Sequence, residues 1–139
     1  MRRTSLVLMA LLFCASATNA QNLVVNGSFE VPSLQPGEQF RVTKIPGWTI
    51  KDEAGNDAEG EIQRGLGITD QEGKQWVELD VGGNTTMYQD IPTVIGQRYA
   101  FGFRDARRGS GANRLIQLVD GQEIGNSTAS SLAFRNNRV

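Results

Sequence analysis

The chain has 139 residues, with 14 lysines and arginines against 15 aspartates and glutamates, no histidine and one cysteine. Because Cys14 lies in an N-terminal segment that we expect to be removed, the mature chain is predicted to lack a thiol nucleophile, a disulfide, a histidine-containing triad and a histidine-ligated zinc site. The net charge of −1, which becomes more negative once Arg2 and Arg3 leave, gives no electrostatic reason to bind nucleic acid.

Residues 1–20 have the parts of a secretory signal peptide. Two arginines precede an apolar run of about a dozen residues, and small residues follow up to Ala20. The run is shorter than the roughly twenty apolar residues of a membrane-spanning helix. We therefore expect cleavage after Ala20, a secreted protein without a transmembrane segment, and one domain over residues 21–139. A lipid-modified Cys14 and twin-arginine export are the disfavoured alternatives.

Apolar and polar residues alternate with period two along much of residues 21–139, and no stretch keeps helical spacing for three turns. The mature chain is therefore predicted to be nearly all strand, with turns at its glycine, proline and asparagine clusters. The expected strands are Leu23–Val25, Phe40–Thr43, Trp48–Lys51, Glu61–Arg64, Gln75–Asp80, Thr85–Ile91, Gln97–Asp105, Leu115–Val119 and Glu123–Ile124.

The strongest alternation lies in Gln97–Asp105, where Tyr99, Phe101 and Phe103 share one face. We expect this strand in the core of a sheet. Asp120-Gly121 predicts a tight hairpin turn near the C-terminus. Many short strands without a helix predict a β-sandwich.

Five carboxylates fall within ten residues: Asp52, Glu53, Asp57, Glu59 and Glu61. Such oxygen ligands suit calcium, so structural calcium is a candidate, and no other cofactor is indicated. The spacing does not fit a helix-loop-helix calcium loop. A solvated acidic loop is the favoured interpretation.

Glu78 and Asp80 share one face of an expected strand with Trp76. Paired carboxylates are typical of glycoside hydrolases, which need one protonated and one ionised group. A polar strand face is the simpler interpretation, and so small a chain has little room for a substrate cleft. Alternation places Val77 and Leu79 in the core and Trp76 outward, so Trp76→Ala is predicted to weaken ligand binding and Val77→Asp to unfold the domain.

The large aromatic residues with a polar handle are Trp48, Trp76 and Tyr88. Beside carboxylates, such rings suit sugars, whose C–H faces stack on them while their hydroxyls form hydrogen bonds. Packing at the edge of a sandwich is the alternative. Arg107 lies with Arg104 and Arg108 near two glycines and is a candidate for binding a sugar carboxylate, against a solvated loop.

Six short motifs follow one another in an order that resembles a known family. They are Asn22 to Glu30 (NLVVNGSFE), Pro46 to Trp48 (PGW), Glu61 to Gln63 (EIQ), Gln75 to Asp80 (QWVELD), Met87 to Asp90 (MYQD) and Gly96 to Tyr99 (GQRY). The family is the one called domain of unknown function 642, with its bacterial anchored relatives. The resemblance runs from about Asn22 to Ile124. It implies a galactose-binding-like jelly roll at a cell surface or cell wall, polysaccharide binding and no established catalysis.

The chain departs from that family at its C-terminal end. Relatives continue with further strands, whereas Ser127 to Val139 is short and polar. The comparison therefore implies a truncated C-terminus and a sandwich that lacks its last strands.

These observations predict a secreted, non-catalytic module that binds cell-wall or extracellular-matrix polysaccharide. The candidate ligand contacts are Trp48, Trp76, Glu78, Asp80, Tyr88 and Arg107. A structural surface or matrix protein that acts through protein contacts is the alternative. A small glycoside-active enzyme is less favoured.

Overall fold

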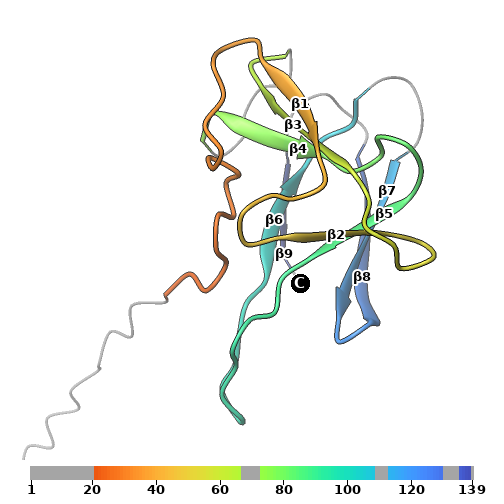
Figure 1. The fold of residues 1–139 in the computed structure, drawn as a ribbon. Coiled ribbons are helices and arrows are strands. Elements are labelled where there is room, and N and C mark those ends of the chain that lie inside the picture. The colour runs from red at the N-terminus through yellow and green to blue at the C-terminus, as the bar shows by residue number, and fades with distance from the viewer. Residues whose placement is uncertain (1–20, 67–72, 109–112, 130–134, 139) are drawn as a thin grey trace, which may run out of the picture.

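The computed structural model describes residues 21–66, 73–108, 113–129 and 135–138, and within these ranges it holds strands and turns but no helix (Figure 1). The all-β prediction is confirmed. The strands are β1 Gln39–Val42, β2 Thr49–Asp52, β3 Gly60–Arg64, β4 Gln75–Glu78, β5 Thr85–Tyr88, β6 Gly102–Asp105, β7 Asn113–Val119, β8 Gln122–Ala129 and β9 Arg135–Arg138. Nothing in the described part of the chain is a helix long and apolar enough to cross a membrane. The expected signal peptide lies outside these residues.

The strands form four antiparallel units. One is a three-stranded sheet in the order β1-β3-β4, and the others are the two-stranded ladders β2-β5, β6-β9 and β7-β8. Figure 1 shows the three-stranded sheet at the top of the view and the ladders below it. This antiparallel arrangement is consistent with a β-sandwich. The jelly-roll order of strands that the resemblance implies stays a prediction.

Most of the expected strands lie within one or two residues of the observed ones. The hairpin turn is also confirmed, because Asp120 and Gly121 join β7 to β8 with φ angles of 49° and 76°. Both residues are in the left-handed region, as the tight turns preferred between twisted strands require. A β-bulge interrupts this ladder between Gln117 and Leu118.

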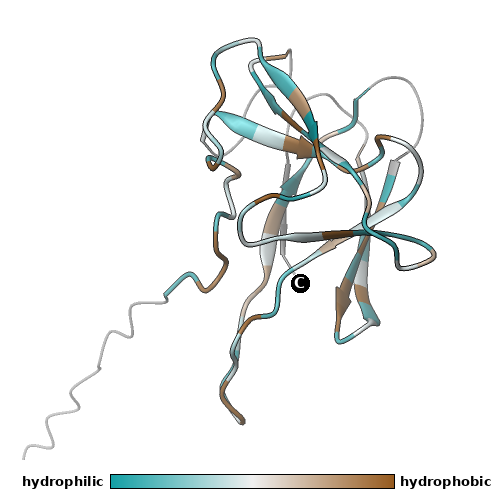
Figure 2. Ribbon diagram, viewed as in Figure 1, coloured by the Kyte–Doolittle hydropathy of each residue, from teal (hydrophilic) through white to brown (hydrophobic). Residues whose placement is uncertain are grey.

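The prediction for Gln97–Asp105 was wrong over its first half. Only Gly102–Asp105 forms strand β6, and the side chains of Tyr99 and Phe101 are exposed. The described pairs between β6 and β9 run from Gly102↔Arg138 to Asp105↔Arg135, and residues 97–101 belong to no strand. Alternation identified a face, but burial also needs a neighbouring element to cover it. Hydrophobic residues accordingly mark the tip of the segment between β5 and β6 (Figure 2).

Strand β9 comes from the polar C-terminal end, for which the sequence predicted no strand. Arg135–Arg138 pair with β6 along its whole length. This segment contains no apolar residue, so its sequence did not indicate a strand. A strand that pairs with a distant partner needs no apolar pattern of its own.

The predicted strand Leu23–Val25 is also absent, and side-chain amides hold the N-terminal segment instead. The Asn26 amide donates to the carbonyls of Val31 and Pro46, at 2.8 and 3.1 Å. The amide of Gln89 bonds both the N–H and the carbonyl of Val25. Amide side chains can satisfy backbone groups in this way without a ladder.

The core is small and mixes apolar with polar side chains. Its aliphatic centre is Ile45, Ile50 and Ile62, each at most 1% exposed. Gly60 brings the three-stranded sheet close to β2, since a Cβ there would lie only 3.0 Å from the Cδ1 atom of Ile50. Gln63 and Gln75 are buried beside this centre.

Trp76 belongs to this core, so its predicted outward orientation was wrong. The residue is only 5% exposed, whereas Val77 and Leu79 are half-buried. Both faces of β4 are covered at this point, and alternation within a strand cannot tell which of two covered faces is packed more tightly.

Candidate functional site

The three-stranded sheet carries a polar pocket of about 350 Å³ on one face, which we call the carboxylate pocket. It is lined by Gln39, Arg41, Glu61, Glu78, Asp80, Val81 and Arg108. The register of the three strands brings its charged residues together, because Arg41 lies opposite Glu61 and Glu61 lies opposite Glu78. Residues directly opposite in neighbouring strands point to the same side of a sheet, so these three side chains form one row.

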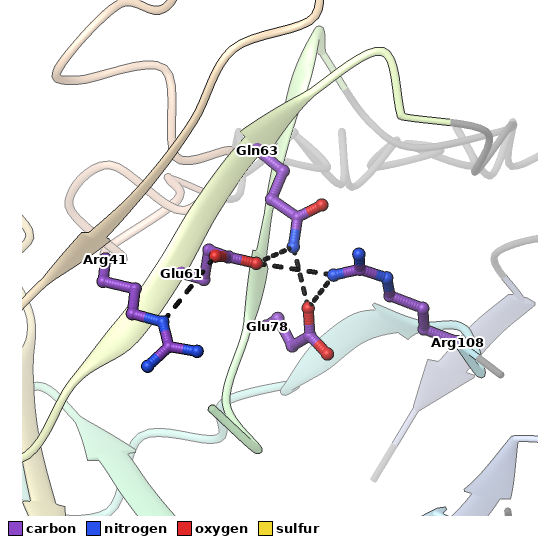
Figure 3. Close-up of polar contacts among 5 residues, drawn as sticks. All are labelled: Arg41, Glu61, Gln63, Glu78 and Arg108. Carbon is purple, nitrogen blue, oxygen red and sulfur yellow. Dashed lines mark hydrogen bonds and ion pairs between the residues drawn. The ribbon is translucent and has the colours of Figure 1, made fainter. Parts of the chain in front are cut away.

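Two glutamates face each other in this row, and an arginine and an amide join them (Figure 3). The Nε2 group of Gln63 donates to Oε2 of Glu61 at 2.6 Å and to Oε2 of Glu78 at 2.7 Å. Arg108 forms a short hydrogen bond to the same oxygen of Glu78 and lies 3.4 Å from Oε2 of Glu61. Like charges directly opposite in a ladder destabilise it, and these shared donors offset that repulsion.

The two arginines of the pocket are held to different degrees. The hydrogen bond to Glu78 raises the pKa of Arg108, partial burial opposes this, and Glu61 adds to it. Arg41 is more loosely held, since its Nε atom lies 4.0 Å from Oε1 of Glu61 and its side chain is 60% exposed. Asp80 is exposed and has no hydrogen bond or ion pair to the described residues.

Gln63 positions both glutamates from inside the sheet. It is fully buried, and its Oε1 atom has no hydrogen-bond partner among the described residues. Its cross-strand neighbour on the same face is the buried Trp76. The prediction that Trp76 shares a face with Glu78 therefore agrees with the register, but Trp76 is buried and does not line the pocket.

Trp48 lies in a second, more apolar hollow, which we call the Trp48 groove. Its volume is about 540 Å³, and it is lined by Thr43, Lys44, Ile45, Pro46, Trp48, Thr49, Ile50 and Asp57. The half-buried indole is fixed in orientation, because its Nε1 group donates to the carbonyl of Asn26 at 3.2 Å. The ring of Phe29 packs against it at a centroid distance of 5.6 Å.

Tyr88 and Arg107 line neither of these two hollows. Tyr88 is 42% exposed on β5 and lies opposite Thr49, next to the Trp48 groove. Arg107 is half-buried, and its Nε atom is buried without a hydrogen-bond partner in the described part of the chain. Its neighbour Arg108 is the arginine that reaches the carboxylate pocket.

Four of the five clustered carboxylates considered for calcium have different partners, and Glu59 has none among the described residues. Asp52 accepts hydrogen bonds from Asn56, and Asp57 pairs with Lys51 at 2.7 Å. Glu61 faces the carboxylate pocket. Within the described residues, no group of three or more acidic or cysteine side chains is arranged to hold a metal ion.

Only three of the six predicted ligand residues line one of these two hollows. Glu78 and Asp80 line one pocket, and Trp48 lines the other, with Tyr88 beside it. Sequence analysis missed Arg41, Gln63 and Arg108 as partners of the glutamates. The pairing of β1, β3 and β4 brings Arg41 and Gln63 to the glutamates, whereas Arg108 reaches them from the segment that follows β6.

Several motifs behind the family resemblance contact one another in the fold. Glu30 accepts hydrogen bonds from the backbone of Lys74 and Gln75, at 2.6 and 3.0 Å. Trp48 bonds the backbone of Asn26, and Gln89 bonds that of Val25. No family model, curated protein or solved structure matches this chain in comparisons with known proteins.

Proposed function

We propose that this chain is a secreted, non-catalytic carbohydrate-binding module for cell-wall or extracellular-matrix polysaccharide, and that the Trp48 groove holds the sugar. One observation carries the proposal: an indole of fixed orientation beside an aliphatic floor and a rim of hydroxyl and charged groups. Sugar rings need this combination, because their C–H faces stack on aromatic surfaces while their hydroxyls take hydrogen bonds.

The fixed indole also lowers the cost of binding. A side chain already held by Asn26 and Phe29 loses little rotamer freedom when a ligand arrives. The floor residues Ile45 and Ile50 are part of the core, so the groove is built on rigid elements. The volume of about 540 Å³ falls within the usual range for small-ligand sites.

The carboxylates that suggested hydrolysis are better suited to binding than to catalysis. The Oε2 atoms of Glu61 and Glu78 are already engaged by Arg108 and Gln63. A glycosidase needs two carboxyl groups that are free to reach the glycosidic bond. Asp80, the other member of the pair, is exposed and has no hydrogen bond or ion pair to the described residues that would fix its position.

A panel of soluble and insoluble polysaccharides tests the proposal. Trp48→Ala should weaken binding by about 1–2 kcal/mol, roughly five- to thirtyfold, because it removes the stacking surface. Trp48→Phe keeps a ring and should retain most of the affinity. Lys74→Ala is the control, because this exposed lysine lines neither hollow and its side chain makes no hydrogen bond to a described residue. Folded protein that binds no member of the panel would refute the proposal.

A structural role through protein contacts is the second candidate, and exposed apolar side chains favour it. On β7 and β8, Ile116, Leu118 and Ile124 are between 42 and 47% exposed. Exposed apolar groups that gather in one place mark contact surfaces. Sedimentation of the purified protein tests this role: concentration-dependent association that Leu118→Lys abolishes would support it, and a monomer at high concentration would exclude self-assembly.

A further inference from the structure

The carboxylate pocket has an excess of negative charge that its own cations do not neutralise. Three carboxylates, from Glu61, Glu78 and Asp80, line it with the two guanidinium groups of Arg41 and Arg108. Arg108 is already engaged in ion pairs, because its Nη1 atom bonds Oε2 of Glu61 and Oε2 of Glu78. Asp80 has no hydrogen bond or ion pair to the described residues. A ligand that fits this pocket should therefore bring positive charge.

The free atoms of the glutamates support the same conclusion. The contacts of Gln63 and Arg108 all use the Oε2 atoms. Oε1 of Glu61 has only the distant Nε atom of Arg41, at 4.0 Å, and Oε1 of Glu78 has no partner in the described part of the chain. Acceptors without a donor beside an uncommitted Asp80 suit a compact ammonium group, which donates three hydrogen bonds from one atom.

The rest of the lining suits hydroxyl groups. Gln39 and Arg41 are exposed on the β1 side of the pocket and have uncommitted donors. The volume of about 350 Å³ lies at the small end of the range for ligand sites, which is appropriate for about one sugar ring. A neutral sugar would leave the charge excess unmatched, and a uronic acid would add to it.

We propose that the carboxylate pocket binds an amino sugar through its free ammonium group, with the glutamates and Asp80 as the ammonium acceptors. This site is separate from the Trp48 groove and does not rest on the sugar binding proposed there. Glucosamine and N-acetylglucosamine are the matched probes, because they share a ring and differ in whether the nitrogen is charged.

Titration calorimetry or chemical-shift mapping at about pH 6 and low salt measures the two affinities. Glucosamine should bind at least tenfold more tightly than N-acetylglucosamine, and added salt should reduce the difference. Glu78→Gln should cost about tenfold for glucosamine and little for N-acetylglucosamine. Asp80→Asn, which breaks no contact between described residues, should cost about two- to fivefold.

Two further variants test whether removing a positive charge from the pocket strengthens glucosamine binding, and provide a control outside the pocket. Arg41→Gln removes a competing cation and should strengthen glucosamine binding. Glu123→Gln is the matched control, because Glu123 is also an ion-paired glutamate, 3.2 Å from Arg114, but lies outside the pocket. It should leave the affinity unchanged.

Equal affinity for the two probes, or the same affinity in Asp80→Asn and Glu78→Gln as in the folded parent, would overturn the proposal. A pentalysine peptide gives the third arm. If it binds with the same dependence on Glu78 while glucosamine does not bind, the pocket recognises basic peptides and the amino-sugar assignment is wrong. Polysaccharide binding is scored separately with Trp48→Ala, so either proposal can fail alone.

Discussion

At the scale of single residues, the buried side chain of Trp76 is expected to contribute to the stability of the fold. It lies beside Gln63 in the core of the three-stranded sheet. We predict that Trp76→Ala lowers the free energy of unfolding by about 3–5 kcal/mol, the cost of removing a large buried ring. Urea denaturation measures this value. A loss below about 1 kcal/mol would show that the indole is not part of the core.

Asp52 gives the clearest dependence on pH. A hydrogen bond from the Asn56 side chain, and then one from its backbone N–H, hold the pKa of Asp52 below its ordinary value of 3.8. A lowered pKa in the folded state adds stability that is present above the ordinary value and is lost as the pH falls through the folded one. The melting temperature of Asp52→Ala should therefore lie below the parent's near about pH 6 and approach it near about pH 2.

Glu59 provides the comparison for this measurement. It is exposed and has no hydrogen bond or ion pair to the described residues. The melting temperature of Glu59→Ala should follow that of the parent at every pH. If the melting temperature of Asp52→Ala also follows that of the parent at every pH, the bonds from Asn56 contribute nothing to stability.

At the scale of elements, the β7–β8 hairpin depends on the conformation of its turn. Gly121 has a φ of 76°, and the space around it is open, so an alanine there would be strained without a clash. We predict that Gly121→Ala destabilises the protein by about 1–2 kcal/mol. Gly82 also has open space but no left-handed φ, so Gly82→Ala should be neutral or slightly stabilising. Thermal melts of both variants check this, and equal melting temperatures would contradict it.

Local sequence patterns predicted the strands in which apolar and polar residues alternate. They failed where the structure depends on pairing with a distant part of the chain. Alternation and turn residues located β1 to β5 and the hairpin. They could not show that Tyr99 and Phe101, which alternate like core residues, lie outside β6 and are exposed. The same limit applies to the candidate site. Glu78 and Asp80 were recognisable as a polar face, whereas their meeting with Glu61 and Arg108 depends on long-range pairing.

At the scale of the whole molecule, side-chain hydrogen bonds join the irregular N-terminal segment to the strands. Gln75 is the central example, since its Oε1 atom accepts from the N–H of Leu34 at 2.6 Å and its amide donates to the carbonyls of Phe29 and Pro32. Glu30 binds back to the start of β4 from the same N-terminal segment. The segment that contains the first motif is thus part of the folded unit although it forms no strand.

This attachment has a consequence for hydrogen exchange. The amide protons of Val25, Val31 and Leu34 lie outside every strand, yet each is bonded to a side-chain oxygen: those of Gln89, Asn26 and Gln75. They should exchange with deuterium far more slowly than the free amides of an irregular chain, and each should lose its protection on its own when its acceptor is replaced. Gln75→Leu should thus release the Leu34 amide while that of Val25 stays slow. The N-terminal segment would then open in separate steps, each controlled by one side chain, where a strand would unzip as a unit.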